Sequence, residues 1–216
     1  AAAASLSLGD LTNDAMGGIS STHVDNITTS QIDDMGSTQS SGLDADAIAS
    51  FTATQLAAMT TGAVGGLTKS QVQNFTDDGL SEFSESQLQA LTTGGSGGLA
   101  GISKEHMAEI QADRIDAFDD DDWGAILAGA YEGITREQMM NIPTARATGS
   151  GFSLTRRIKL TPMAISGAHK DILDTDWADW ENSMTQDVRQ ITALTPEMQT
   201  TANNEVSYTA QTIGDI

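Results

Sequence analysis

Several residue types that define common protein classes are missing or rare in this chain of 216 residues. It contains no cysteine, which excludes disulfide bridges and zinc sites built from thiolates. Basic residues are few: ten Lys and Arg stand against 30 Asp and Glu, and the formal charge is −20. Nucleic acid and anionic membrane surfaces would repel such a chain, so we expect neither as a partner.

Long apolar runs are also missing. No run approaches the roughly 18 residues that a membrane-spanning helix needs, so we expect no membrane insertion. The sequence holds no nucleophile elbow, phosphate-binding loop or zinc-binding helix, and we therefore expect no catalytic residues and no cofactor. The small residues of the opening AAAASLSLGD resemble those that follow secretory cleavage sites, and an arbitrary start of the chain would look the same, so removal of a signal peptide is left open.

What the chain does contain is an apolar residue at every eighth position. We call this eight-residue unit the octad. Its first apolar position is occupied by Leu11, Ile19, Ile27, Met35, Leu43, Phe51, Met59, Leu67, Phe75, Phe83, Leu91 and Leu99, and after a three-residue insertion by Ile102, Ile110, Phe118, Ile126, Ile134 and Ile142. A second apolar position follows five residues later, from Met16 to Met139, and only Ser40 and Ser96 interrupt it.

A Thr or Ser often follows the first apolar residue, and a Gln comes three places later. The pairs are Thr28 with Gln31, Thr52 with Gln55, Thr68 with Gln71, Ser84 with Gln87 and Thr135 with Gln138. This spacing is typical of a capping box, and the two apolar positions are those that meet in a hydrophobic staple at a helix start. His23 and His106 occupy the Gln position, so we predict that they are capping partners rather than metal ligands. Each octad is therefore predicted to begin a new short helix.

Two other architectures compete with this interpretation. In one continuous helix, an eight-residue period would move the apolar stripe by about 80° per repeat and carry it into solvent. A β-solenoid is the stronger rival because Thr and Gly are plentiful, although the spacing of five and then three residues breaks strict alternation. We therefore predict a mainly α fold, in which residues 1–147 form a solenoid of short capped helices whose octads share one core.

Residues 148–216 are predicted to form a small α+β connector. Phe152, Leu154, Ile158 and Leu160 favour an extended strand, and the run VSYTAQTI near the C-terminus favours another. Between them, apolar residues recur at gaps of three and four, which predicts an amphipathic helix from about Asp171 to Ala193.

The connector also holds the residues that we predict to contact a neighbouring copy. Arg156, Arg157 and Lys159 follow an acidic array that they complement in charge. Trp177 and Trp180 lie on one face of the predicted helix, and aromatic residues of this kind are common interface anchors. These five residues form the predicted interface.

The run from Asp119 to Asp122 is the one candidate for a metal site. Four adjacent carboxylates could bind structural Ca²⁺, which takes oxygen ligands. The run lacks the alternating spacing that wraps a loop around an ion, and the octad frame makes these residues a cap and first turn, where acids are favoured. We therefore expect helix starts and little calcium dependence.

The units ITTSQIDDM, FTATQLAAM, LTKSQVQNF, FSESQLQAL and ITREQMMNI resemble the short Leu-Thr-x-x-Gln-Ile-x-x-Leu repeats found in arrays of large bacterial surface and secreted proteins. The resemblance covers about residues 11–142. It implies an extracellular or cell-surface location and a structural or adhesive role. The leading expectation is a self-assembling structural subunit of a bacterial appendage, filament or surface layer that forms a homopolymer. The alternatives are a surface adhesin or calcium-dependent binding module, and then a virion structural protein.

Overall fold

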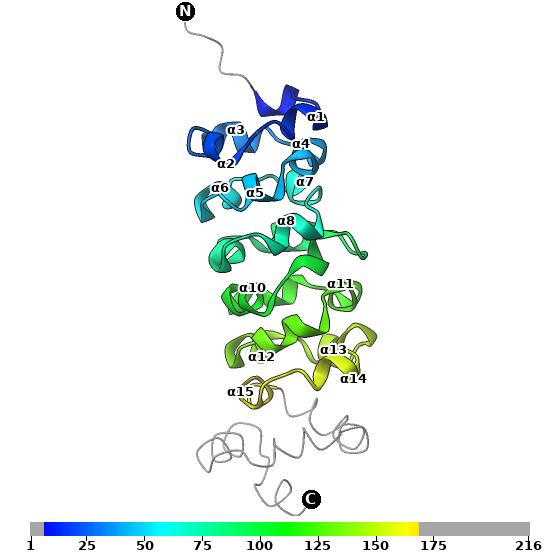
Figure 1. The fold of residues 1–216 in the computed structure, drawn as a ribbon. Coiled ribbons are helices and arrows are strands. Elements are labelled where there is room, and N and C mark those ends of the chain that lie inside the picture. Colours follow the sequence, from blue (N-terminus) through cyan, green and yellow to red (C-terminus); the bar gives the residue numbers. More distant parts are fainter. Residues whose placement is uncertain (1–6, 169–216) are drawn as a thin grey trace, which may run out of the picture.

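The computed structural model describes residues 7–168 of the chain. Short helices joined by tight turns are stacked in layers along one axis, with α1 near one end and α15 near the other (Figure 1). No strand forms within these residues, and the isolated β-bridge found there pairs Thr68 with Gly97. The expectation of a mainly α chain is confirmed for the part that the structure describes.

The helix starts follow the predicted capping chemistry. At each of the five Thr/Ser–Gln pairs, the hydroxyl accepts from the Gln N–H, while the Gln side chain accepts from the N–H of the capping residue. His23 and His106 fill the same role for Ser20 and Ser103, as predicted. Because each box satisfies two backbone donors that a helix start leaves free, a helix of only four to six residues can begin at these octads.

The helices form three columns. The chain winds around the axis of the stack, and each element packs on the element that lies one full winding earlier in the same column. Column A contains α1 (Asn13–Met16), α4 (Ser37–Gly42), α7 (Thr61–Val64), α9 (Glu85–Ala90), the 3-10 helix η4 (Ala112–Ala117), α12 (Arg136–Asn141) and α15 (Pro162–Ile165). The starts of α1, α4, α7 and α9 are 24 residues apart. One turn of the chain is therefore three octads, and we call this turn a coil.

The other two columns are built in the same way. Column B contains α2 (Ser21–Val24), α5 (Ala45–Ile48), α8 (Lys69–Gln73), η3 (Gly98–Gly101), α11 (Asp120–Ala125) and η6 (Ser150–Phe152), the last in contact with α13 (Thr144–Ala147). Column C contains η1 (Leu8–Asp10), α3 (Thr29–Asp33), α6 (Ala53–Ala57), η2 (Asp77–Leu80), α10 (Lys104–Glu109), η5 (Ala128–Gly133) and α14 (Leu154–Arg157).

The core runs along the axis of the stack and is filled by the two apolar positions of each octad. The second position is buried from the first coil onward, at Met16, Val24 and Ile32. The first position is buried from Met35 onward, where each residue can pack on the coil before it. Neighbouring coils therefore share one continuous core, as a repeat array requires.

The coils are also joined by side-chain hydrogen bonds from the residue four places after the first apolar position, which we call the bridging position. Gln71 shows the complete pattern. Its Oε1 accepts from the Thr68 N–H at 2.8 Å, and its Nε2 donates to the Ser40 and Leu43 carbonyls of the coil before, both at 2.7 Å. The side chain is 3% exposed, so it satisfies groups that water does not reach.

Other residues repeat the bridge along the stack. Gln39 donates to Gly9 and Leu11, Gln55 to Val24 and Ile27, Gln87 to Ala57 and Met59, and Gln138 to Met107 and Ile110. His106, Arg114 and Arg156 hold the same position, and bond the carbonyls of Phe75, Phe83 and Ile126 respectively. The bridging position thus links most coils to the one before.

At the octad of Ala63, where the bridging residue is small, a hydroxyl replaces the amide. Ala63 cannot reach the coil before, but the hydroxyl of Thr60, the cap of the same octad, donates to the Met35 carbonyl at 3.0 Å. Ser40, which interrupts the second apolar position, is fully buried and donates to the Ala63 carbonyl at 2.6 Å. Its hydroxyl therefore serves the same joining function.

The structure corrects the prediction for the start of the connector. The strand expected across Phe152, Ile158 and Leu160 is wrong, because η6 and α14 occupy this stretch. Phe152 and Leu160 are buried first apolar residues, eight apart, and Thr161 caps α15. Ile142 and Phe152 are ten residues apart instead of eight. These two extra residues shift the octad frame, so a strict period of eight does not extend past Ile142. The rest of the predicted connector, residues 169–216, lies outside the described residues.

Both breaks in the octad frame fall in column B. The first lies between Leu91 and Ile102 and contains Gly94, whose φ of 98° is a conformation that glycine adopts readily. The second lies between Ile142 and Phe152 and contains α13. Because each break occurs on the same side of the stack, columns A and C keep their contacts across both.

The bridge predicts a specific loss of stability. Replacing Gln71 by Met, which is of similar size, should lower the free energy of unfolding by about 3 kcal/mol. The substitution leaves the Thr68 N–H and two buried carbonyls without a hydrogen-bond partner. Urea denaturation followed by circular dichroism measures this change. The matched control is Gln73→Met on the exposed face of the same helix, and equal effects of the two substitutions would contradict the bridge.

Candidate functional site

The first coil exposes apolar groups that every later coil buries. Leu11, Ile19 and Ile27 stand at the first apolar position of α1, α2 and α3 and are only partly buried. The same position is at most 5% exposed at every octad from Met35 onward. Among the described residues, only column C has an element before the first coil, because η1 packs on α3. We call the surface at α1 and α2 that carries Leu11 and Ile19 the N-terminal face.

His23 lies at the bridging position of this face. Its Nδ1 accepts from the Ser20 N–H at 3.0 Å, so Nε2 carries the proton of the neutral ring. In His106, the equivalent nitrogen lies 3.2 Å from the Phe75 carbonyl oxygen of the coil before. The side chain of His23 is exposed, and its Nε2 has no hydrogen-bond partner within residues 7–168. The N-terminal face thus presents a donor as well as apolar side chains.

Apolar exposure also occurs toward the other end of the stack. The large apolar side chains exposed in the described part are Leu127, Met140, Ile158 and Met163, between 39% and 58% exposed. Met140 and Met163 belong to α12 and α15, which pack on each other in column A. The coils between the two ends expose no large apolar side chain among the residues described.

The acidic run forms a helix start, as predicted. Asp119 caps α11 by accepting from the Asp121 and Asp122 N–H groups. In return, the Asp122 carboxylate accepts from the Asp119 N–H. Asp120 reaches across column B and accepts from the Ser150 N–H and hydroxyl. No group of three or more metal-ligating side chains is found in residues 7–168. Asp119 and Asp122 thus serve as capping residues. The expected lack of calcium dependence stays a prediction.

Partial burial sets the electrostatics of this helix start. Burial raises the pKa of Asp122 above its ordinary value of 3.8, and the charges of Asp119 and Asp121 raise it further. The hydrogen bond from the Asp119 N–H and the charge of Arg146 act in the opposite direction but do not offset the increase. Asp122 is therefore more easily protonated in the folded chain than in the unfolded chain.

The two breaks in the octad frame border one pocket. Its volume is about 660 Å³, and it lies over α11 in column B. Thr93, Gly94 and Gly95 come from the first break, and Ser150 and Gly151 come from the second. Lys69, Asp121 and Leu127 contribute charged and apolar side chains. We call this space the insertion pocket.

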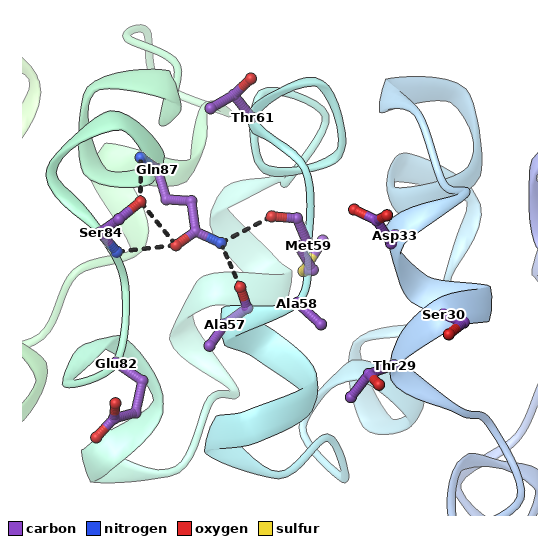
Figure 2. A pocket seen from close by; sticks show the side chains of 10 residues that line it. All are labelled: Thr29, Ser30, Asp33, Ala57, Ala58, Met59, Thr61, Glu82, Ser84 and Gln87. Atoms are coloured by element: carbon purple, nitrogen blue, oxygen red, sulfur yellow. Dashed lines mark hydrogen bonds between the residues drawn. The ribbon is translucent and has the colours of Figure 1, made fainter.

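A second hollow is an open groove of about 590 Å³ that crosses three coils (Figure 2). Ala57 and Ala58 lie between walls that carry Asp33 on one side and Glu82 and Ser84 on the other. Gln87 borders the groove, but its amide is committed to the Ala57 and Met59 carbonyls, as the dashed lines show. The groove results from the small side chains of one octad. Apart from exposed hydroxyls and acids, every described group that lines it has a structural role.

The structure places the predicted interface residues in different environments. Arg156 donates to the Gly124 and Ile126 carbonyls of its own chain. Arg157 is 9% exposed and donates to the Phe152 carbonyl at 2.6 Å, so its predicted place on a surface is wrong. Lys159 pairs with Glu132 at 3.4 Å on the surface, where ion pairs contribute little to stability.

Trp177 and Trp180, the remaining predicted contacts, lie outside the described residues. The described aromatic residues are structural instead. Trp123, Tyr131 and Phe152 pack against one another with ring centroids 4.9 to 5.6 Å apart, and the Tyr131 hydroxyl donates to the Trp123 carbonyl at 2.8 Å. Burial raises the pKa of Tyr131 far above its ordinary value, which keeps the phenol protonated.

Comparison with family models, with curated proteins and with solved structures found no match for this chain. None of the helices in the described part has the length and apolar character needed to cross a membrane.

The acidic helix start predicts a pH-dependent effect. Asp122→Asn keeps an oxygen that accepts from the Asp119 N–H but removes a partly buried charge, so it should stabilise the chain at neutral pH. Because the folded-state pKa of Asp122 is raised, its ionisation costs stability above that pKa and nothing below 3.8, where both states are protonated. Urea denaturation at neutral and acidic pH should show the gain shrinking as the pH falls. A gain that is the same at every pH would contradict the assigned cause.

Proposed function

We propose that this chain is a structural subunit that assembles end to end with copies of itself. Its building block is a solenoid of capped octads, and the assembly is a filament, appendage or surface layer on the outside of a bacterial cell. The location and the bacterial source rest on the resemblance of units such as ITTSQIDDM and ITREQMMNI to repeats of bacterial surface and secreted proteins.

The observation that carries the proposal is the partly exposed first apolar position of α1 and α2. The first apolar position of α3, Ile27, is partly buried as well, and from Met35 onward the coil before covers this position. An end face of a repeat array is therefore incomplete until another layer covers it. A contact between unlike ends of identical subunits does not close on itself, so it propagates into a ring or a filament.

The charge of the chain is consistent with contact through its ends. At a net charge of −20, copies repel one another, so contact is expected where apolar side chains are exposed. Among the described residues, the exposed large apolar side chains lie on residues 127–163, near one end of the stack, and Leu11 and Ile19 at the N-terminal face are partly buried. Assembly should accordingly strengthen as salt screens the repulsion.

A binding module is the second candidate, and the insertion pocket favours it. Insertions in repeat proteins gather on one face, and this face is often the one that binds a ligand. The pocket volume of about 660 Å³ lies within the usual range for small-molecule sites, roughly 300–1,000 Å³. A ligand in this pocket and assembly through the ends are compatible, because they use different surfaces.

Assembly is tested on the full chain at physiological salt by light scattering and analytical ultracentrifugation. We expect concentration-dependent polymers, and we expect Leu11→Ser with Ile19→Ser to weaken association at least tenfold. Because both side chains also pack against the core, some loss of folding stability is expected, so association is compared under conditions in which urea denaturation shows that both chains are fully folded. The matched control is Thr54→Ser on the exposed side of α6, which should assemble like the unchanged chain. A chain that stays monomeric at high concentration would overturn the proposal.

A further inference from the structure

The insertion pocket has two walls that hydrogen bonds hold in place. On the first wall, the Lys69 N–H donates to the Ser96 carbonyl at 2.8 Å, which ties the loop of the first break to α8. On the second wall, Asp120 accepts from the Ser150 N–H at 3.1 Å and from the Ser150 hydroxyl at 3.0 Å. Because both breaks are tied to elements of other coils, the space between them is built into the fold, as ligand sites usually are.

Two glycines that line the pocket are not required by the fold around them. A Cβ at Gly95 would meet no atom within 4 Å, and the φ of Gly95 is not positive. A Cβ at Gly124 would meet only the Gly151 Cα, at an ordinary contact distance of 3.8 Å. Alanine favours a helix over glycine, so Gly124 weakens α11. What the two glycines do provide is room in the pocket.

The pocket also holds opposite charges that do not pair with each other. Lys69 is partly buried, and its ammonium group has no hydrogen bond or ion pair with any residue of the part that the structure describes. The carboxylate of Asp121 lines the same pocket and is likewise unpaired within residues 7–168. Leu127, which is 47% exposed, adds an apolar side chain. The pocket thus offers a cation, an anion and an apolar surface to one ligand.

The positions of the two charges restrict the ligand. Lys69 and Asp121 stand on α8 and α11, which lie on opposite sides of η3 in column B. A free amino acid carries both of its charged groups on one carbon, whereas the ends of a peptide are separated by about 3.3–3.6 Å per residue. A simple anion would be repelled by Asp121, and a neutral sugar would leave Lys69 without a counter-charge. A zwitterionic peptide has no net charge, so the charge of −20 does not repel it.

We propose that the insertion pocket binds a short peptide that has free ends and an apolar side chain. Lys69 pairs with the C-terminal carboxylate of the peptide, Asp121 pairs with its N-terminal ammonium group, and the apolar side chain packs on Leu127. This inference rests on the second candidate function, for which it names the ligand class. It is independent of assembly through the ends of the stack.

Binding is measured by isothermal titration calorimetry of the full chain with the tripeptide alanyl-leucyl-alanine and two derivatives. One derivative is acetylated at its N-terminus and lacks the ammonium group. The other is amidated at its C-terminus and lacks the carboxylate. We expect the free peptide to bind at least tenfold more tightly than either derivative, which is the effect of losing one charge-assisted hydrogen bond.

Substitutions assign each end of the peptide to a residue. Lys69→Met should weaken binding of the free peptide about tenfold and leave binding of the amidated peptide unchanged, because that peptide has no carboxylate to lose. Asp121→Asn should act in the same way on the free and acetylated peptides. Lys104→Met and Asp46→Asn are the matched controls, since both residues stand at the same octad positions as Lys69 and Asp121 but outside the pocket. Both controls should bind like the unchanged chain.

Gly124→Leu tests the place of binding. Leucine is a good helix former, so the urea midpoint should not fall, but the side chain fills the pocket and should abolish binding. If the free peptide does not bind, or binds Gly124→Leu equally well, the inference is overturned. If all three peptides bind equally and only Gly124→Leu prevents it, the pocket binds peptides but the assigned charge pairing is wrong. Sedimentation of the chain without peptide reports on assembly separately, so failure of the two proposals can be told apart.

Discussion

The two-way hydrogen bonding of the bridging side chain is the interaction on which the rest of the stack depends. In Gln71, one amide oxygen caps the helix of its own octad, and one amide nitrogen closes the end of a helix in the coil before. A helix of four to six residues leaves most of its backbone groups unpaired, so it cannot exist without such partners. One side chain therefore couples local structure to the packing of coils. The apolar positions supply the driving force, and the bridge determines which surfaces meet.

The sequence predicts the octad well because its causes are local. The capping boxes, the stapled apolar pairs and the roles of His23 and His106 all lie within six residues, and each is present in the structure. The number of octads in a coil is not local, because it depends on how far the Gln71 amide can reach along the stack. No residue pattern states that the partner of Gln71 is Leu43 rather than a residue one octad nearer.

The functional residues were harder to predict for the same reason. Arg156 and Arg157 form a basic cluster in the sequence, which favours a surface contact. The two extra residues before Phe152 shift the octad frame, so Arg156 stands at the bridging position and Arg157 at the second apolar position. The insertion pocket joins two breaks about 50 residues apart, and their closeness follows from the coil length alone.

The coil of three octads is tested most directly by distances between spin labels, because a chain without cysteine accepts labels only at introduced sites. Ser30, Asp46 and Thr54 are exposed, and they stand in α3, α5 and α6. Electron–electron double resonance should find labels at Ser30 and Thr54, which are 24 residues apart in column C, closer together than labels at Ser30 and Asp46, which are 16 apart in different columns. The reverse order of the two distances would contradict the three-octad coil and the bridges built on it.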